Sequence, residues 1–298
     1  MAKALYTTGI LLCLFIQGFA QTTLLRNKIE TLLATKKATV GVSVLALESG
    51  DTLTINNNIH YPMQSVFKFH IALAMLNEVD KGKFSLSQKI MINKSDIVPG
   101  LYSPIHEKYP NGGVQLSLAE ILTYTVAQSD NIGCDKMLQL LGGPAVVNDY
   151  IHKIGIKDIA IKSNERDMQK EWNVQFGNWT TATAATTLLQ IFYNRKILSQ
   201  KSHDFLWATL LATSTGKDRL KGLLPAGTAV AHKTGTSNTN DKGITAAIND
   251  IGIVTLPNGK HFAISVFVSN SKENEATNEK IIASISKMVW DYFITTKK

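Results

Sequence analysis

The sequence predicts an α/β fold in which one antiparallel sheet is built from both chain ends, with flanking helices and an inserted all-α lobe. Stretches rich in β-forming residues occur near the start, at 38–55, and near the end, at 229–269. The chain between them has helical spacing of its apolar residues. Strands at both ends with helices between them indicate a single sheet beside a helical insertion. With 298 residues, 44% of them hydrophobic, the chain can bury a sizeable core.

The first elements follow from local patterns. Apolar residues recur with helical spacing over 24–33, which predicts a first helix. The run 38–47 reads as a strand, 48–51 as a turn and 52–55 as a returning strand, so we expect a hairpin. From Gln64 to Val79 the chain is apolar almost all round, which predicts a helix buried at the centre of the protein.

Later segments complete the expected fold. Further helices are expected at 118–125, 131–141, 145–154, 181–193 and 275–293, and strands at 229–233, 245–256 and 262–269. We expect a signal peptide at 1–20, an α/β lobe from 21–60 and 208–298, an all-α lobe from 61–207, and an active site in the cleft between the lobes.

The first residues have the pattern of a secretory signal peptide. Lys3 precedes an apolar run from Ile10 to Ile16, which is too short to span a membrane. Gly18 and Ala20 then place small residues before a cut at Gln21. Cys13 lacks the small preceding residue of a lipoprotein signal, so a soluble exported protein is favoured over a lipid-anchored one. We therefore expect a periplasmic monomer that has no membrane attachment after cleavage.

Charge and cysteine content narrow the function classes. The formal net charge is +8, but the lysines are scattered and form no basic stripe with aromatic residues, so we expect no nucleic-acid partner. A basic cleft for an anionic small molecule remains compatible with this charge. Removal of Cys13 would leave Cys134 alone, without a disulfide, in an apolar helical pattern typical of a buried thiol. We expect no metal and no cofactor.

Ser65 and Lys68 are the first candidate catalytic pair. Three residues apart at the start of a helix, their side chains lie on one face and within reach of each other. An amine that is neutral, or that relays a proton, can activate a serine hydroxyl. The alternative is a surface serine beside a lysine that extends to solvent. Because Lys68 lies within an apolar run, where an unpaired ammonium is costly, the functional interpretation gains weight.

Two more short motifs follow in the chain. Ser129-Asp130-Asn131 lies between two expected helices and is either a helix N-cap or a proton shuttle followed by a substrate-binding amide. Lys233-Thr234-Gly235-Thr236 ends a strand and offers a cation and hydroxyls to a carboxylate. Its glycine would let a substrate lie along the strand edge. A polar strand end with no function is the alternative for Lys233-Thr234-Gly235 taken alone.

In this order, the three motifs resemble those of the penicillin-recognising serine enzymes. Glu165, in the run 164–169, narrows the resemblance to class A β-lactamases. The runs 102–104 and 224–227 resemble the family's aromatic gate and the loop before its lysine strand. Gln64 and His232, each preceding a motif, make the chain similar to the PER/VEB extended-spectrum subgroup.

The resemblance implies catalytic roles. Ser65 would attack the lactam carbonyl, and the backbone N–H groups of Ser65 and Thr236 would form the oxyanion hole. Either Lys68 or Glu165, acting through a water, would take the serine proton. Ser129 would protonate the leaving nitrogen, and Glu165 would activate the water that hydrolyses the acyl-enzyme.

The resemblance also implies a substrate-binding set. Lys233, Thr234 and Thr236 would hold the substrate carboxylate, with Arg219 as the completing cation and Lys242 as a second candidate. The other residues implied to line the substrate site are Tyr102, Asn131, Gln169 and Gly235.

Three departures from the family pattern fall in the segment around Glu165. Gln169 stands where an asparagine is usual, which changes the side-chain length near the hydrolytic water. Arg166 follows the glutamate, and a cis bond before a residue other than proline costs about 3–4 kcal/mol, so we expect a trans bond. Ser163 and Asn178 replace the usual arginine and aspartate, so the customary salt bridge is expected to be missing.

Two competing functions share the same serine. One is a D,D-peptidase or transpeptidase, and the other is a non-catalytic penicillin-binding sensor that stays acylated. Glu165 discriminates between them and a β-lactamase, because neither alternative has a dedicated deacylating base. The sequence therefore favours hydrolysis of β-lactam antibiotics, including extended-spectrum cephalosporins.

Overall fold

The structure, a computed structural model, describes residues 22–296. The signal peptide expected at 1–20 lies outside these residues. A five-stranded antiparallel sheet in the order β2-β1-β10-β9-β8 forms the framework of this part of the chain. Its strands are β1 (Thr39–Ala46), β2 (Thr52–Ile55), β8 (Val230–Thr236), β9 (Thr245–Thr255) and β10 (His261–Ser271). Strand β1 pairs with β10, so the N-terminal hairpin and the three C-terminal strands form one sheet, as the sequence predicts.

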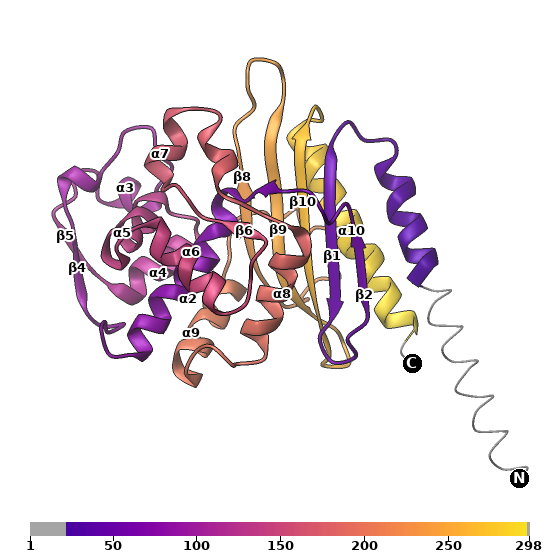
Figure 1. Ribbon diagram of the computed structural model, residues 1–298, viewed down its shortest axis with the longest axis horizontal. Coiled ribbons are helices and arrows are strands. Elements are labelled where there is room, and N and C mark those ends of the chain that lie inside the picture. The colour runs from indigo at the N-terminus through magenta and orange to yellow at the C-terminus, as the bar shows by residue number, and fades with distance from the viewer. Residues whose placement is uncertain (1–21, 297–298) are drawn as a thin grey trace, which may run out of the picture.

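Helices cover both faces of this sheet (Figure 1). A helix over residues 22–33 and α10 (Glu275–Thr296) lie on one face, and α8 (Ala182–Tyr193) lies on the other. The remaining helices are α2 (Phe67–Asp80), α3 (Pro104–Lys108), α4 (Leu118–Ala127), α5 (Asn131–Leu141), α6 (Pro144–Lys153), α7 (Glu165–Lys170) and α9 (Gln200–Leu211), with 3₁₀ turns η1 (Gln64–Val66), η2 (Lys94–Asp96) and η3 (Val174–Gly177).

Alternation along the strands divides the hydrophobic interior in two. Ile264 and Val266 of β10 belong to the core beneath α10 and the 22–33 helix, whereas Ala263 and Phe267 of the same strand belong to the core on the helical side. Side chains on successive strand positions point to opposite faces, which produces this division. The β10 strand therefore joins both cores of the described chain.

Helix α2 runs through the larger core, as its all-round apolar pattern predicts. Its residues from Phe67 to Leu76 are buried. Cys134 on α5 is buried and free, in agreement with the expected core thiol. Burial raises the pKa of the Cys134 thiol well above its usual value, so the thiol stays protonated.

Short strands accompany the helices between 61 and 207. They are β3 (Tyr61–Pro62), β4 (Lys89–Ile92), β5 (Val114–Ser117), β6 (Ile159–Ala160) and β7 (Trp179–Thr180). The first, fourth and fifth form a small sheet in the order β3-β7-β6, and β4 pairs with β5. These strands, with α3, α7 and α9, are elements that the sequence analysis did not predict. The division into two lobes stays a prediction.

Candidate active site

The candidate nucleophile lies at the entrance of the central helix. Ser65 is in η1, and Lys68 is in the first turn of α2. The Lys68 Nζ atom lies 2.8 Å from Ser65 Oγ. Lys68 is fully buried because the helix that carries it runs through the core. The structure thus brings together the pair whose three-residue spacing predicts one helix face.

Lys68 is the centre of a hydrogen-bond network. Its ammonium lies 2.8 Å from the Ser129 carbonyl oxygen and 2.8 Å from Glu165 Oε1, and it donates to Asn131 Oδ1 through a short contact. A buried charge is tolerated when it is paired and hydrogen-bonded. These contacts meet that requirement, and they collect residues from three separate parts of the chain.

Ser129 lies between two lysines. Its backbone is in the left-handed region, with φ of 61°, a conformation that is uncommon for serine and occurs often at functional sites. Lys233 Nζ donates to Ser129 Oγ at 3.0 Å, while Lys68 contacts the Ser129 carbonyl. The next residue, Asp130, caps α5 by accepting from Gly133 N. The capping and functional interpretations of this motif are therefore compatible.

Lys233 is buried at the edge of the sheet. Its Nζ also donates to the carbonyl oxygen of Thr234 at 3.0 Å. Desolvation by burial, reinforced by the nearby Lys68 charge, lowers the pKa of Lys233 well below its usual value. A substrate carboxylate beside this amine would favour its charged form.

Gly235 allows β8 to lie against η1. A Cβ at this position would overlap the Met63 carbonyl oxygen and come within 3.1 Å of Gln64 Cβ. The absence of a side chain therefore brings the end of β8 close to the turn that carries Ser65. This approach places the peptides of Ser65 and Thr236 on neighbouring elements, as a shared oxyanion hole requires.

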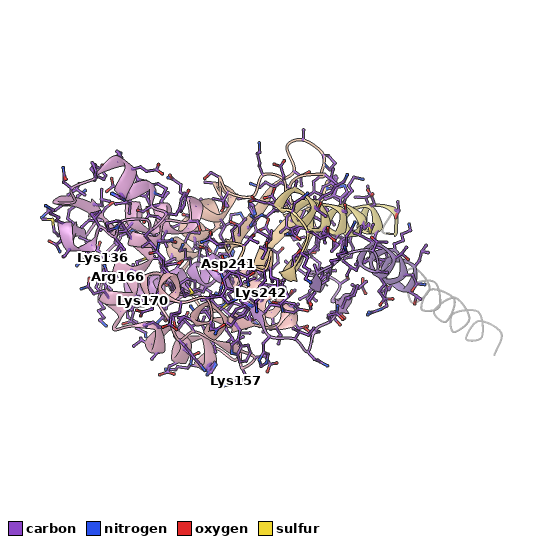
Figure 2. The ribbon with its side chains drawn as sticks, turned by 90° about the horizontal axis from the view of Figure 1, so that it is seen from above. Lys136, Lys157, Arg166, Lys170, Asp241 and Lys242 are labelled. Carbon is purple, nitrogen blue, oxygen red and sulfur yellow. The ribbon has the colours of Figure 1, made fainter. Side chains whose placement is uncertain are left out.

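Arg219 lies behind the end of β8 and is 3% exposed. One guanidinium nitrogen donates to Thr236 Oγ1 at 2.8 Å, and another donates to the carbonyl oxygens of Gly235 and Asn249, each at 3.1 Å. Its Nε lies 3.0 Å from Glu279 Oε1. Lys242, the second candidate, is exposed in the turn between β8 and β9 (Figure 2). Of the two cations, Arg219 is the one hydrogen-bonded to the implied anion site.

Glu165 begins α7, behind the N-cap Asn164. Its Oε1 atom lies 3.5 Å from Ser65 Oγ and 2.8 Å from Lys68 Nζ. Asp135 of α5 accepts the backbone N–H of Glu165 at 2.8 Å and that of Arg166 at 3.1 Å. The described residues contain no cis peptide bond, so the bond between Glu165 and Arg166 is trans, as expected.

The segment 163–178, hereafter the glutamate loop, is closed by an amide. Among the described residues, no ion pair joins Ser163 to Asn178, in line with the sequence. Instead, Asn178 Oδ1 accepts the N–H groups of Lys162 and Ser163 at 2.7 and 2.9 Å, and its Nδ2 donates to the Ser163 carbonyl at 2.8 Å. The Asn178 carbonyl also accepts from Met63 N, so the loop end is tied to the chain just before Ser65.

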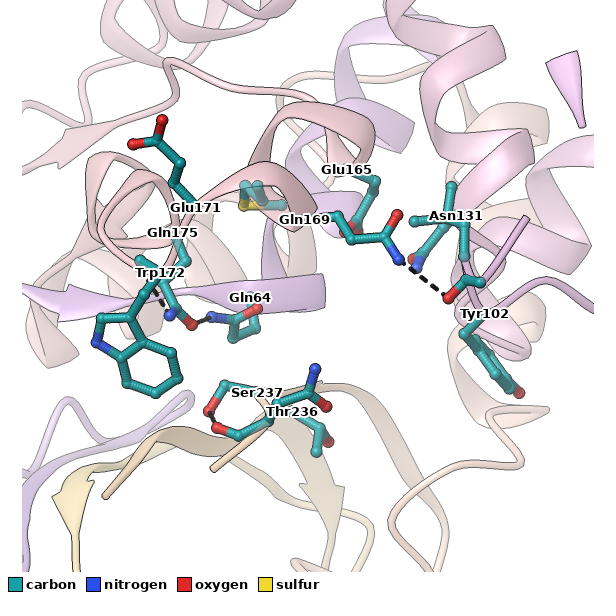
Figure 3. A pocket seen from close by; sticks show the side chains of 14 residues that line it. Gln64, Tyr102, Asn131, Glu165, Gln169, Glu171, Trp172, Gln175, Thr236 and Ser237 are labelled. Carbon is teal, nitrogen blue, oxygen red and sulfur yellow. Dashed lines mark hydrogen bonds between the residues drawn. The ribbon is translucent and has the colours of Figure 1, made fainter. Parts of the chain in front are cut away.

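A pocket of about 350 Å³ opens above these groups (Figure 3). Gln169 Nε2 donates to the Gly100 carbonyl oxygen at 3.1 Å, so this amide links the glutamate loop to the segment before Tyr102. Tyr102 is 53% exposed at the rim, as expected of a gate. The pocket-lining residues include Gln64, Tyr102, Asn131, Glu165, Gln169, Trp172, Gln175, Thr236 and Ser237.

Sequence reasoning missed three residues of this site. Asp135 follows Asn131 by four positions on α5, a spacing that places both on one helix face and could have identified it. Gln175 Oε1 accepts from Gln64 Nε2 at 2.6 Å, and Trp172 lines the pocket nearby. No signal in the sequence marks these last two, because the contact of Gln175 with Gln64 spans 111 positions and the place of Trp172 at the pocket wall depends on how the glutamate loop folds.

Comparison with known proteins identifies the family. The model of the β-lactamase enzyme family matches residues 24–293. The chain is 51% identical over 290 residues to β-lactamase VEB-1 and 42% identical over 293 residues to extended-spectrum β-lactamase PER-1, both of Pseudomonas aeruginosa. These matches cover 96% and 97% of this chain, and 96% and 95% of the relatives.

A solved class A β-lactamase from Bacteroides cellulosilyticus DSM 14838 has the same fold. It superposes with a TM-score of 0.89 at 42% identity, over 92% of this chain and 99% of that chain. The fold and the composition of the site are those of a serine hydrolase of the penicillin-recognising class. The chain belongs to the β-lactamase enzyme family, and within it to class A.

Proposed function

We propose that this chain hydrolyses β-lactam antibiotics, extended-spectrum cephalosporins among them, through an acyl-enzyme on Ser65. The observation that supports it most strongly is the cluster in which Lys68 Nζ lies 2.8 Å from both Ser65 Oγ and Glu165 Oε1. A nucleophile, an amine and a carboxylate within reach of one another can perform both acylation and deacylation.

Acylation begins with attack of Ser65 Oγ on the lactam carbonyl carbon. The serine proton passes to Lys68 directly or to Glu165 through a water, and the geometry supports both routes because each group lies near Oγ. The backbone N–H groups of Ser65 and Thr236 stabilise the oxyanion, typically a large contribution to catalysis. As the C–N bond breaks, Ser129 gives its proton to the lactam nitrogen and recovers one from Lys233 or Lys68, which flank it.

Deacylation uses Glu165. This carboxylate takes a proton from a water, the resulting hydroxide attacks the ester carbonyl, and Ser65 leaves with a returned proton. Asp135 holds the backbone at Glu165 and so fixes the carboxylate over Ser65. A dedicated base of this kind supports hydrolysis over the two alternatives, a peptidase and a sensor that stays acylated.

Substrate binding uses the edge of β8. Lys233, Thr234 and Thr236 hold the carboxylate, with Arg219 supporting Thr236 through its hydrogen bond. Asn131 binds the side-chain amide of the substrate, and Tyr102 and Gln169 border the cleft. Gly235 lets this end of β8 lie against η1, which carries Ser65.

The extended spectrum is supported by the relatives and by the glutamate loop. PER-1 is named an extended-spectrum β-lactamase, and the chain is 42% identical to it. The loop is closed by the Asn178 amide rather than by an ion pair, and its residues Gln169 and Trp172 line the pocket that would receive the acyl side chain. The proposal includes export to the periplasm as a monomer, supported by the signal pattern at 1–20. No helix among the described residues is both long and apolar enough to cross a membrane.

A steady-state panel tests the function. The purified mature chain should hydrolyse benzylpenicillin and an oxyimino-cephalosporin, cefotaxime or ceftazidime, with repeated turnover. A burst of one equivalent without turnover would identify a sensor instead. Strong preference for benzylpenicillin with negligible oxyimino-cephalosporin hydrolysis would show that the subgroup assignment is wrong, while leaving the β-lactamase activity intact.

A further inference from the structure

Trp172 is a large aromatic side chain that the hydrophobic core does not use. It lines the active-site pocket and is only half-buried. It belongs to neither hydrophobic core cluster, and its ring contact within the described chain is an edge-to-face one with Phe176, with centroids 6.1 Å apart. An indole at a pocket wall, outside the core, offers a flat apolar surface to a ligand.

The backbone of Trp172 is tied to the nucleophile. Its carbonyl oxygen accepts from Gln175 Nε2 at 2.7 Å, and Gln175 Oε1 accepts from Gln64 Nε2 at 2.6 Å. Gln64 directly precedes Ser65 and is itself held in the left-handed region, with φ of 48°. These two hydrogen bonds fix the position of the Trp172 backbone relative to Ser65.

The strand side of the pocket is also fixed. Figure 3 shows the indole at the left of the pocket and Ser237 and Thr236 beside it, below the centre. Ser237 Oγ donates to the Asn238 carbonyl at 2.9 Å and accepts from Ala247 N at 2.9 Å, so this edge is braced by β9. Tyr102 lies at the far end of the same pocket. The result is a slot with one apolar and one polar wall.

We propose that Trp172 is a specificity-determining residue, on which the planar ring of a β-lactam's acyl side chain stacks. This inference rests on the proposed function and adds a substrate preference to it. In that proposal, Asn131 binds the amide of the substrate's acyl side chain. The slot between Trp172 and Ser237 then receives the ring that the acyl side chain carries beyond this amide. The indole N–H makes no hydrogen bond to any residue of the described chain, so it is available to a polar atom of the same side chain.

The magnitude follows from aromatic stacking. Two stacked aromatic rings attract each other more strongly than their buried area alone predicts. This additional attraction corresponds to a roughly two- to tenfold change in kcat/KM. The effect should be confined to substrates that carry a ring. A comparison between benzylpenicillin, which has a phenyl side chain, and 6-aminopenicillanic acid, which has none, isolates it.

The experiment measures kcat/KM for both substrates in the parent, Trp172→Ala, Trp172→Phe and the control Trp207→Phe. Trp207 packs on Phe192 and His203 of the helical core, away from the pocket. Trp172→Ala should lower the ratio of benzylpenicillin to 6-aminopenicillanic acid by roughly two- to tenfold, mainly through KM. Trp172→Phe should retain most of the ratio, and Trp207→Phe all of it.

Two outcomes overturn the inference. A ratio unchanged by Trp172→Ala, or equal losses on both substrates, would assign Trp172 a structural role only. A parent enzyme that turns over neither substrate would overturn the proposed function, and this inference with it. The two failures are distinguishable because the second already appears in the parent.

Discussion

Two regions of the active site are built on different principles. The nucleophile cluster, consisting of Ser65, Lys68, Ser129 and Lys233, uses charged side chains from elements far apart in sequence. Both of its lysines are almost completely buried. Lys68 contacts four oxygens, one of them from the Glu165 carboxylate, which is the condition for keeping such a charge inside a protein. Lys233 donates to two neutral oxygens, and burial lowers its pKa.

The glutamate loop is held mainly through hydrogen bonds to its backbone instead. Asn178 closes it through three hydrogen bonds to residues 162 and 163, and Asp135 supports its other side by accepting two backbone N–H groups. Glu165 is the loop residue whose side chain reaches into the nucleophile cluster. The loop is thus tied to the site through a charged side chain and to the scaffold through its backbone.

The two regions differ in how freely their side chains can change. Reaction chemistry dictates the side chains of the nucleophile cluster, because only an amine and a hydroxyl at these positions move the proton. Closure of the glutamate loop requires only that backbone groups be satisfied, which an amide achieves as well as an ion pair.

Removal of the Lys68 ammonium should have the largest effect. Lys68→Ala deletes the group that contacts Ser65, Ser129 and Glu165 together. Acylation should slow by about 10²–10⁴-fold, the usual cost of losing a positioned proton-transfer group. Stopped-flow acylation by a chromogenic cephalosporin measures it, with the exposed Lys83→Ala as control. An acylation rate equal to that of the parent would show that the cluster does not depend on its central amine.

The anion site should come next. Arg219→Ala removes the support of Thr236, and charge-assisted hydrogen bonds are worth about 1.5–3 kcal/mol. KM for cephalosporins should rise by roughly tenfold or more, with the circular dichroism spectrum unchanged. Lys242→Ala, in the exposed turn, is the matched control. If Lys242→Ala raises KM and Arg219→Ala does not, the wrong cation has been assigned.

Asn178 tests the loop itself. Asn178→Ala leaves the N–H groups of Lys162 and Ser163 without their acceptor, so the free energy of unfolding should fall by about 1–3 kcal/mol. Deacylation should slow more than acylation, because Glu165 lies in this loop. Urea unfolding and the size of the acylation burst measure the two effects. Asn258→Ala, in an exposed turn, is the control; equal behaviour of the two variants would contradict amide closure of the loop.

Asp135 should affect stability rather than catalysis most clearly, and the effect should be visible in the pH dependence of the free energy of unfolding. Burial, reinforced by the Glu165 charge, raises the pKa of Asp135 from 3.8 to about 6. Between these values the native state binds more protons than the unfolded state, so this group's contribution to stability falls as pH rises. Asp135→Asn removes the titration.

The stability of the parent relative to Asp135→Asn should therefore decrease between about pH 4 and about pH 7. Urea unfolding of both proteins across that range measures the difference. A difference that is constant, or that grows with pH, would show that the carboxylate is better stabilised in the folded state than its burial implies.

The nucleophile cluster could be anticipated from the sequence because each of its motifs is local. The Ser65–Lys68 spacing and the apolar run of α2 identify a buried amine beside a serine. The strands at both chain ends likewise carry strong local patterns, and their pairing into one sheet is confirmed. Local chemistry and local periodicity suffice for these parts.

The supports of the glutamate loop could not be anticipated in the same way. The absence of a Ser163–Asn178 ion pair and the trans bond after Glu165 follow from residue types. The hydrogen bonds that hold the loop in place of an ion pair could not be predicted. They come from the Asp135 carboxyl and the Asn178 side-chain amide, and they depend on how α5 and the loop meet in space. The same holds for the contact of Gln175 with Gln64 and for the place of Trp172 at the pocket wall.

Trapping of the acyl-enzyme tests whether Glu165 of the glutamate loop is required for deacylation while Lys68 of the nucleophile cluster can support acylation without it. Glu165→Ala removes the carboxylate that lies 3.5 Å from Ser65 Oγ and leaves the serine and both lysines in place. Incubation with benzylpenicillin, followed by intact mass spectrometry, should reveal a covalent adduct that maps to Ser65 and persists. Rapid turnover by Glu165→Ala with no adduct would contradict the account.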